Sequence, residues 1–167
     1  MRSYEGGAEN RQHGAMTTTT ASGSSITIVP PQHPLRGRVS PPGSKSITNR
    51  ALLLAALASG TSRLTGALKS DDTRYMAAAL RAMGVRIEEP DETGFVVTGS
   101  GRLQAPAEPL FLGNAGTATR FLTAAAAIVD GTVVVDGDAH MRKRPIGPLV
   151  TALRSLGIEA LAPTGCP

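Results

Sequence analysis

The chain has 167 residues, of which 41% are hydrophobic and 3% aromatic, and its formal net charge is +4. This length suffices for one domain with a buried core, and no apolar run is long enough to span a membrane. The basic residues are scattered and few aromatic side chains could stack on bases. The composition therefore argues against a nucleic-acid partner and favours small anionic substrates.

The cysteine and histidine content narrows the chemistry further. Cys166 is the only cysteine, so no disulfide can form within the chain, which indicates a reducing compartment such as the cytoplasm. His13, His33 and His140 have no spacing that would form a metal site with it. No metal is therefore predicted.

Residues 1–25 are polar, rich in Gly, Ser and Thr, and show no hydrophobic period. We predict a disordered tail over this stretch, with no secretory signal and with Met16 as an alternative start. Two short strands are predicted next, at residues 26–29 and 36–39, on either side of a pair of prolines.

A turn at Pro41–Gly43 separates these strands from a Leu- and Ala-rich run. Two prolines and a glycine do not fit inside a helix, whereas Ser44 directly after them suits the N-cap position. The pattern predicts a helix from Ser44 to about Gly60, where the glycine ends it.

The start of this helix carries an unusual set of side chains. Lys45, Ser46 and Arg50 fall in its first two turns, where unpaired backbone N–H groups and the helix dipole already favour an anion. The helix dipole disfavours cations at this end, and a bound anionic ligand would compensate for them. A nucleotide P-loop is excluded because Ser44 and Val39 stand where that motif needs glycine.

The first helix is followed by a strand, a second helix and a strand pair. The second helix runs from Ser70 to about Met83, with Asp71 and Asp72 interpreted as capping residues. Lys69 is expected at a strand end on the surface. The predicted strands occupy residues 62–68, 85–88 and 95–98.

A second cycle of elements then begins. Its predicted parts are a strand at 110–112, a turn at 113–117, a helix to about 129, a strand at 132–135, a polar loop at 136–144, a helix from Pro145 to 157 and a strand at 158–161.

The two cycles match each other in sequence. Arg50 corresponds to Arg120 and Leu52 to Leu122, and further ordered matches follow with small drifts in spacing. We infer an internal repeat, with units at about 43–109 and 113–167 that bury their apolar helix faces against one another. The repeat doubles the anion-receptive helix start, and Arg144 precedes a third.

Four motifs occur together in one order: residues 42–52, 70–72, 113–120 and 141–146. In these the chain closely resembles the 5-enolpyruvylshikimate-3-phosphate synthase family. The resemblance implies an α/β (α+β) fold of repeated βαβ-type units, with residues 26–167 as a partial enolpyruvyl transferase domain. Family members are more than twice as long, so the chain is expected to be a fragment with an incomplete first lobe.

The resemblance also implies a reaction, the transfer of the enolpyruvyl group of phosphoenolpyruvate to the 5-hydroxyl of shikimate 3-phosphate with release of phosphate. No cofactor is implied, and the full-length enzyme is expected to be a monomer. By motif, Lys45 is the catalytic residue that touches both substrates. Ser46 and Arg50 hold the shikimate moiety, while Asn114, Gly116 and Arg144 bind phosphoenolpyruvate.

Two alternatives remain open. The chain could be an anion-binding or regulatory module that kept the fold without catalysis. It could also resemble UDP-N-acetylglucosamine enolpyruvyl transferase, although that enzyme's Lys-Asn motif does not match Lys45-Ser46. One departure from the family pattern is Phe121, where many members carry proline.

Overall fold

The computed structural model describes residues 27–167, and its backbone contacts divide the chain between Val39 and Ser40. Residues 27–39 contain no helix or strand, and the apolar Ile28 and Leu35 are each 84% exposed. The strands predicted here are therefore wrong for the described residues, because a strand needs a neighbour to pair its backbone. The predicted tail over residues 1–25 lies outside the described part.

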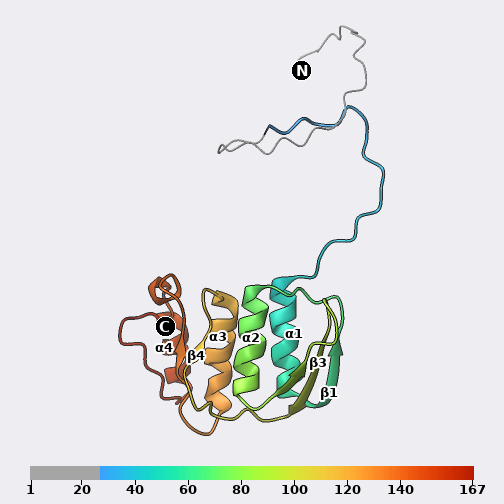
Figure 1. Cartoon of the computed structure of the whole chain (residues 1–167). Helices are drawn as coiled ribbons and strands as arrows, with labels where there is room; N and C mark the ends of the chain where they lie inside the picture. The colour runs from blue at the N-terminus through green and yellow to red at the C-terminus, as the bar shows by residue number, and fades with distance from the viewer. Residues whose placement is uncertain (1–26) are drawn as a thin grey trace. The chain divides into compact units, whose positions relative to one another are not determined.

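Residues 40–167 form a unit of mixed helix and sheet, and α1, α2 and α3 lie side by side in it (Figure 1). In chain order its elements are α1 (Lys45–Leu57), β1 (Ser59–Leu64), α2 (Asp71–Ala82), β2 (Arg86–Glu88), β3 (Phe95–Ser100), β4 (Leu110–Phe111), α3 (Gly116–Ala125), the 3-10 turn η1 (Ala126–Ile128), β5 (Val135–Asp136), the 3-10 turn η2 (Met141–Lys143) and α4 (Gly147–Ser155).

The strands form two small sheets. In the first, the order is β1-β3-β2 with antiparallel pairing, which confirms the predicted strand pair after α2. In the second, β4 and β5 pair in parallel, with Leu110 opposite Val135. The core lies between α1, α2, α3 and the larger sheet, where Leu52, Met76 and Phe95 are at most 1% exposed.

The second helix follows its sequence signals closely. Ser70 is its N-cap, and the helix ends before Gly84, which has a positive φ of 86°. The amide of Val85 donates to the carbonyl of Leu80, so the helix ends in a Schellman-type turn that requires the glycine. The prediction of a helix from Ser70 to about Met83 is confirmed.

The second half departs from its predictions at three places, and the first is the strand predicted at 132–135, of which only Val135 is in a strand, β5. The fourth helix begins at Gly147 and not at Pro145, because the amide of Ile146 donates to the carbonyl of Gly165 and holds these residues outside the helix. The strand predicted at 158–161 does not form among the described residues. Leu161 is 75% exposed there, so no neighbouring strand covers it.

The internal repeat stays a prediction. In its favour, α2 and α4 end in the same geometry, since Gly157 also has a positive φ and Ile158 donates to Leu153 as Val85 does to Leu80. The sheets differ, however, because the first half holds three antiparallel strands and the second half contributes to a single parallel pair.

Candidate active site

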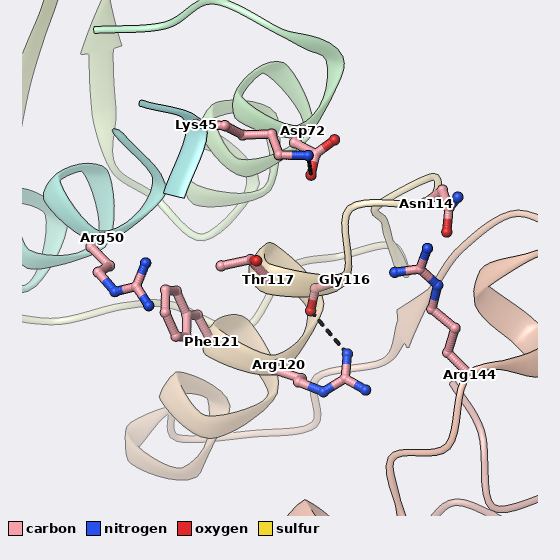
Figure 2. A pocket seen from close by; sticks show the side chains of 9 residues that line it. All are labelled: Lys45, Arg50, Asp72, Asn114, Gly116, Thr117, Arg120, Phe121 and Arg144. Atoms are coloured by element: carbon pink, nitrogen blue, oxygen red, sulfur yellow. Dashed lines mark hydrogen bonds and ion pairs between the residues drawn. The ribbon is translucent and has the colours of Figure 1, made fainter. Parts of the chain in front are cut away.

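One cavity of about 500 Å³ lies where three helices begin (Figure 2). Lys45 and Gly116 are the first residues of α1 and α3, and Asp72 is the second residue of α2. The positive ends of three helix dipoles therefore meet at this cavity, a setting that favours bound anions. The lining residues are Lys45, Arg50, Asp72, Asn114, Gly116, Thr117, Arg120, Phe121 and Arg144.

The charged side chains around the cavity are strongly unbalanced. Lys45, Arg50, Arg120 and Arg144 line it, and Asp72 is the only carboxylate among the lining residues. Grouping four cations around one cavity is electrostatically unfavourable unless a counter-charge is present. The arrangement therefore suits a ligand with several negative charges.

The α1 side of the cavity is fixed by the turn before the helix. The hydroxyl of Ser44 accepts the amide of Ile47 at 3.4 Å and confirms the predicted N-cap. Gly43 packs so closely on the backbone of residues 66–68 that no Cβ would fit. Lys45, directly after the cap, forms an ion pair of 3.1 Å between its Nζ and Oδ2 of Asp72.

Arg50 lies one turn further along the same helix. Its Nη1 donates to the carbonyl of Ser46 at 2.9 Å, and its guanidinium carbon is 5.1 Å from the centre of the Phe121 ring. Figure 2 shows this stacking across the gap between α1 and α3. A cation over an aromatic face is stabilised by the ring quadrupole, so Phe121 gives Arg50 a defined position.

The α3 side is built differently. The Arg144 guanidinium lies between Asn114 and the first turn of α3, and its Nη1 is 2.6 Å from the place of a Cβ at Gly116 (Figure 2). Only glycine allows this approach. Arg120 bridges the two segments, because it donates to the carbonyl of Gly116 at 3.3 Å and to that of Pro145 at 3.1 Å.

The structure brings five of the six predicted site residues to the cavity, namely Lys45, Arg50, Asn114, Gly116 and Arg144. Ser46 is exposed and is not among the lining residues; its carbonyl supports Arg50, and its binding role stays a prediction. Four lining residues were not predicted from the sequence as cavity residues, namely Asp72, Thr117, Arg120 and Phe121. The match between Arg50 and Arg120 was the available signal for Arg120.

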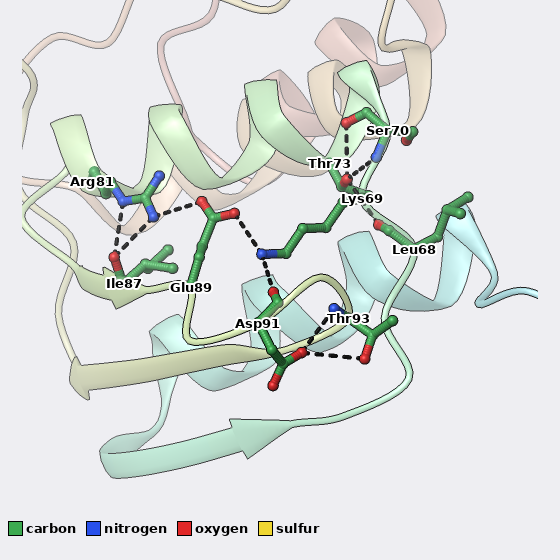
Figure 3. Close-up of polar contacts among 9 residues, drawn as sticks. All are labelled: Leu68, Lys69, Ser70, Thr73, Arg81, Ile87, Glu89, Asp91 and Thr93. Atoms are coloured by element: carbon green, nitrogen blue, oxygen red, sulfur yellow. Dashed lines mark hydrogen bonds and ion pairs between the residues drawn. The ribbon is translucent and has the colours of Figure 1, made fainter.

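The prediction for Lys69 is wrong. Its side chain is only 17% exposed and pairs with Glu89 at 3.0 Å, while its Nζ also donates to the carbonyl of Asp91 and lies 5.1 Å from the Phe95 ring centre (Figure 3). A hydrogen bond from Arg81, together with Lys69, lowers the pKa of Glu89. Lys69 thus ties the segment before α2 to the turn at residues 89–94.

The same segment is tied to α1 and α2 by two hydroxyl groups. Thr48 accepts the amide of Leu68 at 3.0 Å. The hydroxyl of Thr73 accepts the amide of Ser70 at 2.8 Å and donates to the carbonyl of Leu68 at 2.9 Å (Figure 3). These contacts fix the start of α2 and therefore the position of Asp72.

Two further findings concern residues 27–167 only. No three His, Cys, Asp or Glu side chains in this part lie together as a metal ion would require. In the same part, no helix is both long and apolar enough to cross a membrane.

Comparison with known proteins gives consistent matches. The family model of EPSP synthase (3-phosphoshikimate 1-carboxyvinyltransferase) matches residues 29–166. A 3-phosphoshikimate 1-carboxyvinyltransferase of Rhizobium leguminosarum bv. trifolii is 82% identical over 142 residues, covering 85% of this chain and 34% of the relative. The relative from Pseudomonas savastanoi pv. phaseolicola is 70% identical and covers 86% of this chain and 34% of its own length.

Solved structures agree. The EPSP synthase from Acinetobacter baumannii superposes with a TM-score of 0.73 at 35% identity, over 78% of this chain and 31% of that chain. This partial coverage fits the predicted incomplete lobe, and the chain spans about a third of the length of the curated relatives it matches. With the family model covering residues 29–166, this chain belongs to the EPSP synthase family.

Proposed function

We propose that the protein to which this chain contributes transfers the enolpyruvyl group of phosphoenolpyruvate to the 5-hydroxyl of shikimate 3-phosphate and releases phosphate. The observation that carries the proposal is the convergence of Lys45, Arg50, Arg120 and Arg144 on one cavity with a single carboxylate. Both substrates carry a phosphate and a carboxylate, so their combined charge matches this excess of cations. Family membership supports the same reaction.

The cavity geometry suggests how the substrates are shared. The amino end of α3, with Arg144 over Gly116, suits the phosphate of phosphoenolpyruvate, because backbone N–H groups and a guanidinium both donate to phosphate oxygens. Arg50 suits the carboxylate of the shikimate moiety. Lys45 lines the same cavity at the start of α1, and it reaches both substrates by releasing Asp72.

The chemical step needs charge stabilisation at the reacting carbon. The 5-hydroxyl oxygen loses its proton and bonds to C2 of phosphoenolpyruvate, while the C2–C3 double bond opens and C3 takes up a proton, which gives a tetrahedral intermediate. C3 then loses a proton, the C2–C3 double bond re-forms and phosphate leaves with its bridging oxygen, so one proton is taken up and one released at C3 and the hydroxyl proton is the only one displaced. Lys45 and Arg144 stabilise the charge on the departing phosphate, and such fixed cations act strongly where water is excluded.

We also propose a cytoplasmic location, which the single Cys166 supports. We further expect that the full-length enzyme is a monomer and that the reaction involves no metal or nucleic acid. The non-catalytic binding module remains the second candidate, and the observation that favours it is that a cavity lined by four cations can hold anions without any reaction.

One experiment separates the two candidates. The chain is assayed for phosphate release from both substrates, first alone and then joined to the part of the R. leguminosarum relative that it does not cover; this joined protein is called the completed enzyme below. We expect turnover only in the completed enzyme, because catalysis requires groups on both sides of the reacting carbon. A completed enzyme that binds both substrates without turnover would favour the binding module.

A further inference from the structure

The loop between β5 and α4 carries Arg144 to the cavity, and it is anchored to the turn before α3. The amide of Asp138 donates to the carbonyl of Gly113 at 3.0 Å. Gly137 has no room for a Cβ, because that carbonyl and the side chain of Met141 already occupy the space. The first residues of the loop therefore have one position relative to α3.

The middle of the loop is fixed from a second side. Oδ1 of Asp138 accepts the amides of His140 at 2.9 Å and Met141 at 2.8 Å. The Met141 side chain is fully buried, and the Thr119 hydroxyl lies 3.7 Å from its sulfur. These contacts hold the 3-10 turn η2 against α3.

A third contact closes the loop. Arg142 donates from Nε to Oδ1 of Asp136 at 2.9 Å and from Nη2 to Oδ2 at 2.6 Å. This is a two-point guanidinium–carboxylate pair, which fixes orientation as well as distance. The amide of Gly137 adds a bond of 2.7 Å to Oδ1, and these contacts, led by Arg142, lower the pKa of Asp136 to about 2.

Arg144 follows Arg142 by two residues in the chain. Its amide donates to the carbonyl of Met141 at 2.8 Å, so its backbone position follows directly from η2. Among residues 27–167, no carboxylate pairs with its side chain. The direction of the Arg144 guanidinium toward Gly116 therefore depends on how the loop is held.

We propose that Asp136 and Arg142 are positioning residues for Arg144, and that their two-point pair aims its guanidinium at the phosphate of phosphoenolpyruvate. Neither residue lines the cavity, so both act through the loop. The inference rests on the proposed function for the identity of the ligand. Because a small displacement of a binding group is costly, loosening the loop should affect one substrate selectively.

The test substitutes Asp136→Asn, which keeps the oxygen that accepts the Gly137 amide but removes the charge that holds Arg142. In the completed enzyme we expect the KM for phosphoenolpyruvate to rise about fivefold to twentyfold, with kcat and the KM for shikimate 3-phosphate within about twofold. The matched control is Glu88→Gln. It breaks the Arg86–Glu88 ion pair, which is equally short at 2.6 Å but does not line the cavity, and it should change neither KM.

Two double variants exclude a general loss of structure. Asp136→Asn with Arg142→Gln should be no worse than either single variant, and Asp136→Asn should add nothing in an Arg144→Ala background. Additive effects, equal rises in both KM values, or an effect that persists without Arg144 would overturn the proposal.

A binding measurement separates this inference from the proposed function. The 167-residue chain is titrated with phosphoenolpyruvate by calorimetry, with and without Asp136→Asn. Affinity that falls about fivefold or more in the variant supports the positioning role whether or not the completed enzyme turns over. Unchanged affinity contradicts it, whereas absent turnover in the completed parent contradicts only the proposed reaction.

Discussion

The two walls of the cavity differ in how they hold their cations. On the α1–α2 wall, Lys45 is paired with Asp72 and Arg50 is stacked against Phe121. On the α3 wall, Arg120 bonds only to backbone carbonyls in the described residues, and Arg144 is aimed by its loop. Among the described residues, a carboxylate thus compensates one of the two cations on the first wall and neither of the two on the second.

This difference indicates a division of work. An anion on the α3 wall meets two arginines and a helix start without having to displace a carboxylate. An anion on the α1–α2 wall must compete with Asp72 for Lys45. A side chain that can exchange partners suits the reacting centre, whereas a permanently available one suits the binding of phosphate.

The largest effect should follow from removing Lys45. In the completed enzyme, we expect Lys45→Ala to reduce kcat roughly 10²–10³-fold, because a preorganised charge near the departing phosphate is lost. The measurement is phosphate release at saturating substrates. Arg63→Ala is the control, since Arg63 is an exposed cation on β1 and does not line the cavity. Similar activity in the two variants would remove Lys45 from the reacting centre.

The support of the first wall is tested at Lys69. Replacing it by Met removes the donor to the Asp91 carbonyl and leaves Arg81 as the remaining partner of Glu89, so we expect the free energy of unfolding to fall by about 1–3 kcal/mol. Arg86→Met breaks an ion pair whose two side chains are 77% and 55% exposed and should change stability little. Urea unfolding of both variants makes the comparison, and equal midpoints would show that Lys69 is as dispensable as the sequence suggested.

The second wall is tested at Gly116. An alanine Cβ there would lie 2.6 Å from Nη1 of Arg144, so the guanidinium must move aside. We expect the KM for phosphoenolpyruvate to rise about tenfold, with little change in stability because alanine favours the helix. Steady-state kinetics with each substrate varied in turn give the answer. A matching rise for shikimate 3-phosphate would contradict the division between the walls.

The smallest expected effect is on stability at acidic pH, through the Asp136 carboxylate. The pKa of Asp136 is lowered from 3.8 to about 2, chiefly by the hydrogen bonds from Arg142. A lowered folded-state pKa stabilises the fold fully above the unfolded value, and this contribution is lost as the pH falls from about 4 to about 2. The urea midpoints of the parent chain and of Asp136→Asn should differ at about pH 5 and converge as the pH falls to about 2. A constant gap would exclude the carboxylate as its cause.

The sequence predicted correctly those features of the fold that depend on residues close together in the chain. The N-cap at Ser44, the second helix and its end at Gly84 follow from local hydrogen bonds and backbone conformation. The strands expected at 26–29, 36–39 and 158–161 failed among the described residues, because a strand forms only against a partner.

The candidate site was predicted in part for the same reason. Lys45, Arg50 and Gly116 stand at helix starts, which the sequence marks. Asp72 has the position of an ordinary capping residue, and only the packing of α1 on α2 brings it to Lys45. Phe121 likewise acquires its role through the approach of α3 to α1, which no local pattern encodes.

The most direct test of the two-wall account is a crystal structure of the completed enzyme with phosphoenolpyruvate. We expect its phosphate at the amino end of α3, within hydrogen-bond distance of the Arg144 guanidinium and the first backbone amides of the helix, at roughly 2.7–3.2 Å. Lys45 should then contact the substrate, while Asp72 stays on the α1–α2 wall. A phosphate bound instead between Arg50 and Phe121, with Arg144 pointing away, would contradict the account.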